Sequence, residues 1–244
     1  YPLAFEEDGK VISQSFSVGR VTYLLTDLRS EKRRPLFQGD CENPNSSNCK
    51  KTKQGSNFGS NEHLQWFKDQ LLEAKNNNFA VVWHSSFPYL SSPDLSWFNC
   101  DEDNTIKTKN GYECDDHDNW GWYPEEREEV ANFIKNNDIP VCIVSGDAHM
   151  SAIDDGTNSD YATNGGAPIP ILHAGPLDRK PSIKGGPYSH GVSGIRGQYG
   201  IMEITDNGGD ELCIEWKIKN YKGEFVLNTE GELLQYSFCF QLDN

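Results

Sequence analysis

Short apolar runs and segments with helical spacing of apolar residues alternate along the chain. Three apolar runs predict strands, at residues 15–27, 79–84 and 139–145. Two segments with apolar side chains at helical spacing predict helices, at residues 60–76 and 124–136. Ser60 is a plausible N-cap of the first helix, and Pro124 suits the first turn of the second. This order of strands and helices predicts an α/β fold, with His63 exposed near the start of the first helix.

The pattern changes after residue 150. Three segments alternate between apolar and polar residues and predict antiparallel strands, at residues 199–205, 211–219 and 234–242. The Asn-Gly-Gly sequence at 207–209 is typical of a hairpin turn. Residues 169–174 predict a further short strand, expected at a sheet edge because Pro168 and Pro170 lack backbone donors.

The central run at 139–145 ends in a sequence that suggests chemistry. Gly146 lets the backbone turn tightly, and Asp147 and His149 follow two residues apart. Open α/β sheets bind ligands in the crevice at the carboxyl ends of their strands. A carboxylate and an imidazole that converge there suit a divalent or trivalent metal ion. The alternative is a solvated Asp and a hydrogen-bonded His at an ordinary strand end.

Two other apolar runs end on residues that can serve the same crevice. His84 ends the run at 79–84 and is either a second metal ligand or a core histidine bonded to a backbone carbonyl. Asp27 and Arg29 end the first run and either serve the site or form an ion pair within their loop. The Gly-rich stretch at 184–191 can bring backbone amides close to an anion.

Composition limits the class of partner. The chain has 244 residues, enough for one large domain or two small ones, and a formal net charge of -15. No basic stripe is present, so binding to the nucleic-acid backbone is not expected. No apolar run approaches the length of a membrane span. An anionic substrate would therefore need local positive charge, for which a bound metal ion is the obvious source.

The 7 cysteines favour a secreted protein or one in an organelle lumen. Three local pairs are expected, with Cys142 left as a buried free thiol: Cys41 and Cys49, Cys100 and Cys114, and Cys213 and Cys239. Asn45 begins a glycosylation sequon within the first of these loops, which agrees with the same compartment. The alternative is seven reduced thiols in a cytosolic enzyme.

Several motifs in a fixed order make residues 15–240 resemble the alkaline phosphatase D (PhoD-like) family of metallophosphoesterases. They include Ser-Gly-Asp-Ala-His at 145–149, Asp-Leu-Arg-Ser at 27–30, and Trp-Gly-Trp-Tyr-Pro-Glu-Glu-Arg at 120–127. Three further motifs stand at residues 154–161, 173–179 and 184–189. The resemblance implies an α/β (α+β) fold with a two-sheet β-sandwich flanked by helices. It also implies metal-dependent hydrolysis of small phosphate monoesters or diesters, with Fe, Ca, Zn or Mn as the candidate ions.

By this resemblance Asp147 and His149 are the catalytic motif that contacts metal or phosphate. His84 is a further candidate metal ligand because of its place at a strand end. Ser85 stands where relatives often carry an Asn. Three basic residues are hypothetical phosphate neighbours: Arg29, Arg179 and Lys184.

The metal ligands that such enzymes take from earlier strands have no counterpart before Asp27. Residues 1–244 are therefore expected to be a single-domain fragment, the C-terminal portion of the catalytic domain, inactive alone. One rival function is a secreted, non-catalytic binding module that keeps the fold. Another is a Ser-His-Asp hydrolase, which the lack of a Gly-x-Ser-x-Gly elbow disfavours. The oligomeric state and the preference for monoesters or diesters stay open.

Overall fold

The computed structural model describes residues 3–5, 11–39, 49–91, 105–108, 111–114 and 119–242. Within them lies a mixed sheet of eight strands in the order β1-β2-β3-β6-β9-β11-β10-β12. Its strands are β1 (Leu3–Phe5), β2 (Ser13–Val18), β3 (Val21–Leu25), β6 (Ala80–Ser85), β9 (Val141–Ser145), β10 (Ser151–Asp154), β11 (Ile171–His173) and β12 (Val192–Ser193). A second, three-stranded antiparallel sheet comprises β13 (Gln198–Asp206), β14 (Glu211–Asn220) and β15 (Gln235–Gln241).

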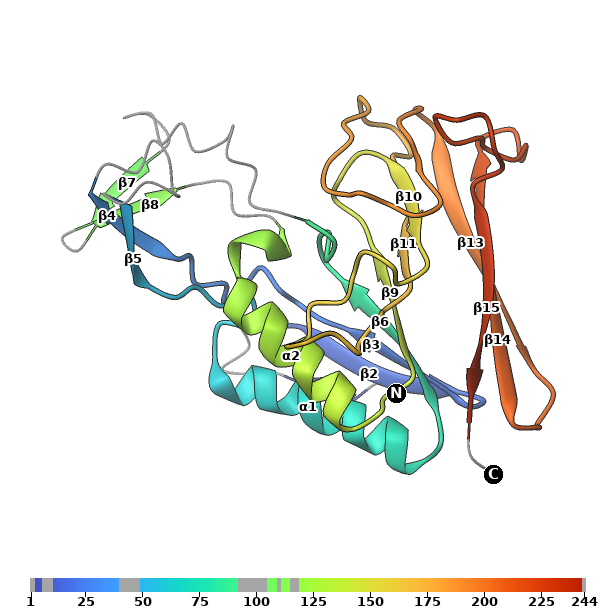
Figure 1. The fold of residues 1–244 in the computed structure, drawn as a ribbon, viewed down its shortest axis with the longest axis horizontal. Helices are drawn as coiled ribbons and strands as arrows, with labels where there is room; N and C mark the ends of the chain where they lie inside the picture. Colours follow the sequence, from blue (N-terminus) through green and yellow to red (C-terminus); the bar gives the residue numbers. More distant parts are fainter. Residues whose placement is uncertain are drawn as a thin grey trace.

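The remaining elements complete the described chain. The helices are α1 (Asn61–Asn76), α2 (Pro124–Asn136) and the short 3₁₀ helix η2 (Trp120–Trp122). A small four-stranded sheet contains β4 (Leu36–Gly39), β5 (Cys49–Lys53), β7 (Thr105–Thr108) and β8 (Gly111–Cys114). In Figure 1 this small sheet lies at one end of the molecule and the three-stranded sheet at the other.

Four neighbouring strands of the large sheet, β3, β6, β9 and β11, run parallel. Helix α1 connects β3 to β6, and α2 connects β6 to β9. Parallel strands joined in this way end at one common edge of the sheet. That edge is where the sequence places the candidate site.

Two apolar clusters define the layers. The first packs α1 and α2 against one face of the large sheet, through residues such as Phe67, Val130 and Trp83. The second packs Val82 and Cys142 from the opposite face against the three-stranded sheet. Figure 1 shows the helices on one side of the large sheet and β13–β15 on the other. The predicted packing of two sheets with flanking helices is therefore observed.

The start of α1 confirms one prediction and overturns another. Ser60 is the N-cap, because its side chain accepts a hydrogen bond from the His63 backbone N–H at 3.1 Å. The expectation that His63 is exposed is wrong, since its exposed fraction is 0%. Its ring lies between Ser13 Oγ at 2.7 Å and the Phe58 carbonyl oxygen at 2.9 Å. Ser13 of β2 and the aromatic rings of Phe58 and Trp66 surround the His63 ring.

Two strand predictions also need correction. The run at 15–27 is a hairpin of β2 and β3 rather than one strand, with Gly19 at φ +57° in the turn. Strand β11 is internal, between β9 and β10, and not an edge strand. Pro170 does not prevent this because it precedes β11 and contributes only its carbonyl, which accepts from the Ile143 N–H at 2.9 Å.

The cysteine predictions are confirmed where side chains are described. Cys213 and Cys239 face each other on β14 and β15 and form a disulfide, and Cys142 is a buried free thiol. The other two predicted pairs and the sequon at Asn45 lie outside the described side chains. Among the helices that the structure describes, none has the length and apolar character needed to cross a membrane.

Replacing Cys213 and Cys239 together by Ala is expected to lower the free energy of unfolding by about 3 kcal/mol, because the crosslink closes a long loop in the unfolded chain. The two cysteines are 26 residues apart in sequence. Urea unfolding monitored by tryptophan fluorescence measures the change. The adjacent cross-strand pair Glu215 and Ser237, replaced by Ala, is the matched control without a crosslink. Equal stability of the two double variants would contradict the prediction.

Candidate functional site

The candidate site is built on the turn of residues 145–149, which follows β9 at the common carboxyl edge. The turn is closed by short-range hydrogen bonds, from the Ala148 N–H to the Gly146 carbonyl at 3.0 Å and from the Met150 N–H to the Ala148 carbonyl at 2.6 Å. Asp147 has φ +76°, a left-handed conformation that non-glycine residues rarely adopt. The turn exposes Asp147 and leaves His149 half-buried.

Arg29 reaches this turn from the loop after β3. Its guanidinium donates to Asp147 Oδ1 at 2.8 Å, forming an ion pair between residues 118 positions apart. The guanidinium carbon also lies 5.6 Å from the centre of the Phe87 ring, and Lys32 Nζ lies 5.2 Å from the same ring. The aromatic face thus holds two cations beside a carboxylate. Arg29 is thus joined to the candidate turn by an ion pair, and its role toward phosphate stays a prediction.

Asp27 shapes the loop that carries Arg29. Its carboxylate accepts hydrogen bonds from the backbone N–H groups of Ile12, Arg29 and Ser30, and from the Ser30 hydroxyl. Burial alone would raise the pKa of Asp27, but these hydrogen bonds outweigh burial and lower it. Asp27 therefore stays charged and holds its loop in place.

His84 lies on the adjacent strand but without a described contact to Asp147 or His149. It pairs in register with Val144 of β9, and its carbonyl accepts from the Thr26 N–H at 3.2 Å. Strand alternation puts its side chain on the same face as Val82, toward the three-stranded sheet. Burial lowers the pKa of His84, which favours the neutral imidazole that metals bind.

The two other predicted phosphate contacts follow β11. The Ser182 N–H donates to the His149 carbonyl at 3.0 Å, and the Lys184 N–H lies 3.3 Å from Met150 Sδ. These contacts bring the backbone of Lys184 beside the turn, while its side chain is exposed. Arg179 is exposed and has no ion pair or hydrogen bond to another described residue. The structure thus brings Arg29, Asp147, His149 and the Lys184 backbone together.

The described residues do not include a complete set of metal ligands. In that part of the chain, the one group of three or more ligand atoms within 4.8 Å of one another comes from Glu211, Cys213 and Cys239. Both of these cysteines are in a disulfide, so that group is not a metal site. The donors of Asp147 and His149 have the chemistry that metals need, a carboxylate oxygen and an imidazole nitrogen. Asp147 and His149 can therefore supply two ligands of a metal ion, which is part of a coordination shell.

The sequence motifs include Ser145 and His173 but do not predict that the two side chains meet or that His173 serves the turn. The ring is completely buried and lies 2.9 Å from Ser145 Oγ and 2.9 Å from the Ala148 carbonyl oxygen. Burial lowers the pKa of His173 to about 4, so the ring is neutral near pH 7. The available signal was a histidine at the end of an apolar run, the same signal that selected His84.

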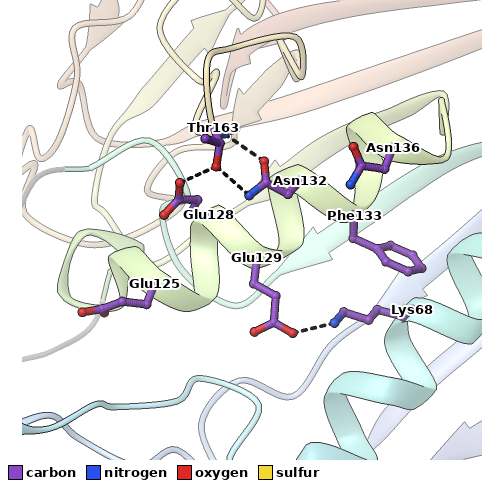
Figure 2. Close-up of a pocket in the computed structure, with 8 residues that line it drawn as sticks. All are labelled: Lys68, Glu125, Glu128, Glu129, Asn132, Phe133, Asn136 and Thr163. Carbon is purple, nitrogen blue, oxygen red and sulfur yellow. Dashed lines mark hydrogen bonds and ion pairs between the residues drawn. The ribbon is translucent and has the colours of Figure 1, made fainter.

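A groove of about 510 Å³ is lined by side chains of α1 and α2 and by Thr163. Figure 2 shows these side chains. The lining of the groove includes Lys68 of α1, whose amine lies 2.6 Å from Glu129 of α2. Glu128 accepts a hydrogen bond from the Thr163 hydroxyl across another part of the groove. None of the predicted site residues lines this groove, so it is separate from the candidate site.

Comparisons with known proteins identify the family. The family model for PhoD-like phosphatases matches residues 2–184, which is more than half of the chain. A solved structure described as "Structure of PhoD" is similar at 17% sequence identity and a TM-score of 0.49, over 95% of this chain. The chain spans 42% of the length of that solved chain. No curated protein matches the sequence. By the family match, the chain belongs to the PhoD-like phosphatases.

Proposed function

We propose that this chain contributes part of the active site of a metal-dependent hydrolase of phosphate monoesters or diesters. The observation that carries the proposal is the turn of residues 145–149, which presents Asp147 and His149 at the carboxyl edge beside Arg29. Membership of the PhoD-like phosphatase family supports hydrolysis of a phosphate ester. A small phosphate ester is the substrate that we propose.

Each candidate residue has a proposed role. Asp147 and His149 hold metal or substrate, and His84 is a further candidate ligand whose neutral ring suits that role. Arg29 can bind phosphate oxygens through its planar, bidentate guanidinium. Lys184 and Arg179 are proposed to add positive charge near the phosphate group. Bound metal ions would polarise the phosphoryl oxygens and supply hydroxide.

We further propose that the remaining metal ligands come from outside these residues. A catalytic metal needs at least three protein ligands in the common case, and the described turn offers two. Arg29 also neutralises the Asp147 carboxylate in this structure. Carboxylate and imidazole donors accept Fe, Zn or Mn, and carboxylates accept Ca, so the donors do not select one ion. We expect the chain alone to be inactive because the ligands that similar enzymes take from earlier strands have no counterpart before Asp27.

Secretion or residence in an organelle lumen is part of the same proposal. It is supported by the disulfide between Cys213 and Cys239, because such bonds persist in oxidising compartments. The sequon at Asn45 agrees with that compartment.

The test compares this chain with the longer product that the proposal implies, called here the full-length protein. Elemental analysis measures bound metal, and chromogenic phosphate monoesters and diesters measure hydrolysis. We expect metal and activity in the full-length protein, both removed by a chelator and restored by the metal, and neither in the 244-residue chain. A metal-free, inactive full-length protein would leave the non-catalytic binding module as the better account.

A further inference from the structure

The His173 ring joins the two ends of the candidate turn. His173 is the last residue of β11 and pairs in register with Ser145, the last residue of β9. Its Nδ1 faces the Ser145 hydroxyl, and its Nε2 faces the carbonyl of Ala148, both at 2.9 Å. A backbone bond from the Ala174 N–H to the Ser145 carbonyl, 3.0 Å long, fixes the two strands beside each other.

The chemistry of the partners determines which nitrogen carries the proton. A carbonyl oxygen can only accept, so Nε2 donates its hydrogen to Ala148. The unprotonated Nδ1 then accepts from the hydroxyl of Ser145. One neutral tautomer therefore satisfies both contacts of a completely buried ring.

The bond to Ala148 acts at a sensitive point of the turn. The Ala148 carbonyl belongs to the peptide bond that links Ala148 to His149, and Ala148 stands between Asp147 and His149, the two residues proposed to hold metal or substrate. Asp147 is already in a left-handed backbone conformation, φ +76°, that favours glycine. A donor that fixes the carbonyl of the next residue limits rotation of the backbone between the two functional side chains.

We propose that His173 is a positioning residue that aims Asp147 and His149 through its hydrogen bond to the Ala148 carbonyl. The inference rests on the proposed phosphatase function of that turn. His173 does not reach the substrate, because its ring is enclosed and both nitrogens are used. Its effect on the reaction passes through the direction of two neighbouring side chains.

Two substitutions separate the contacts of the ring. In His173→Gln the amide nitrogen stands near the position of Nε2 and can still donate to Ala148, whereas His173→Asn reaches only toward Ser145. Ser159→Ala is the control for a lost buried hydrogen bond. The Ser159 hydroxyl is fully buried, donates to the Ile169 carbonyl at 2.6 Å and has no contact with the turn.

The experiment measures kcat, KM, the unfolding midpoint and amide hydrogen exchange in the full-length protein. We expect His173→Asn to lower kcat by about 10–100-fold, the usual effect of removing a group that orients a functional ligand. Exchange at the Met150 amide, which donates to Ala148, should rise in the same variant. His173→Gln should retain most of kcat and exchange protection. Ser159→Ala should lower the unfolding midpoint without changing kcat below it.

Three results would overturn the inference. One is equal kcat for the Gln and Asn variants. Another is wild-type exchange at Met150 in His173→Asn. A third is a loss of kcat in His173→Asn that occurs only at temperatures where the variant begins to unfold. An inactive wild-type protein would count against the proposed function instead. The exchange measurement needs no activity, so it tests the positioning role in either case.

Discussion

Asp147→Asn is expected to lower phosphate ester hydrolysis by the full-length protein about 10²–10³-fold, the usual effect of removing a group that acts on the transition state. The substitution keeps the shape of the side chain and removes its charge. Asn is also among the residues that tolerate a left-handed backbone, which the turn imposes with φ +76°. The loss should therefore come from the missing carboxylate and not from a rearranged turn.

Stability should change little in the same variant. The ion pair between Asp147 and Arg29 is partly exposed, with side-chain exposures of 29% and 42%, and such pairs contribute about 0–1 kcal/mol. Steady-state kinetics and urea unfolding measure the two effects separately. Asp138→Asn is the matched control, because Asp138 has φ +49° and a fully exposed side chain at the end of α2. Full activity in Asp147→Asn would favour a solvated strand-end carboxylate.

Local patterns were sufficient to predict the helices and the main strands. The apolar spacing and Ser60 identified α1, and Pro124 marked the start of α2. The alternation after residue 198 identified the three strands of the smaller sheet. The order of strands was harder, because pairing across a sheet depends on contacts that leave no local signal. The two prolines near β11 suggested an edge strand, although they precede the paired residues.

In the candidate site, too, contacts between residues far apart in the sequence could not be predicted from local patterns. The position of Asp147 and His149 after a buried strand was predicted from their spacing. The contact of Arg29 with Asp147 spans 118 residues and depends on two strand ends that meet only in the folded sheet. The contacts of His173 were not predicted for a similar reason, since its partners lie on the adjacent strand and its turn. His63 was misjudged because a helix start gives no sign of the strand packed against it.

Trp120→Ala is expected to lower the free energy of unfolding by about 3–5 kcal/mol, the range for deleting a buried Trp or Phe side chain. The Trp120 ring is completely buried and lies 5.5 Å from the Trp83 ring and 5.4 Å from the Tyr89 ring, measured between centroids. Its indole N–H donates to Ser85 Oγ at 3.1 Å. The substitution leaves a cavity beside the end of β6 and removes one hydrogen bond to Ser85 Oγ, whose hydroxyl still donates to the Phe87 carbonyl at 2.7 Å.

Trp216→Ala is the matched control in the cluster between the two sheets. Trp216 is also completely buried, so urea unfolding should report a loss of similar size. The two variants should differ in their effect on substrate binding at the candidate site. Trp120 also contacts Phe87, with ring centroids 6.4 Å apart, and Phe87 is the ring beside Arg29 and Lys32.

Under conditions where both variants stay folded, Trp120→Ala should therefore raise KM for the phosphate ester, because Phe87 is free to shift and the two cations with it. Trp216→Ala should leave KM unchanged, since the Trp216 ring packs against Tyr236 and Phe238 of β15 and not against Phe87. Equal KM values in the two variants would mean that the Phe87 ring does not hold the cations in a position that matters for binding. A decrease in the free energy of unfolding of less than about 1.5 kcal/mol for Trp120→Ala would contradict the prediction. A cost that small is typical of substitutions that conserve volume, so the neighbouring side chains would have to fill the space of the deleted ring.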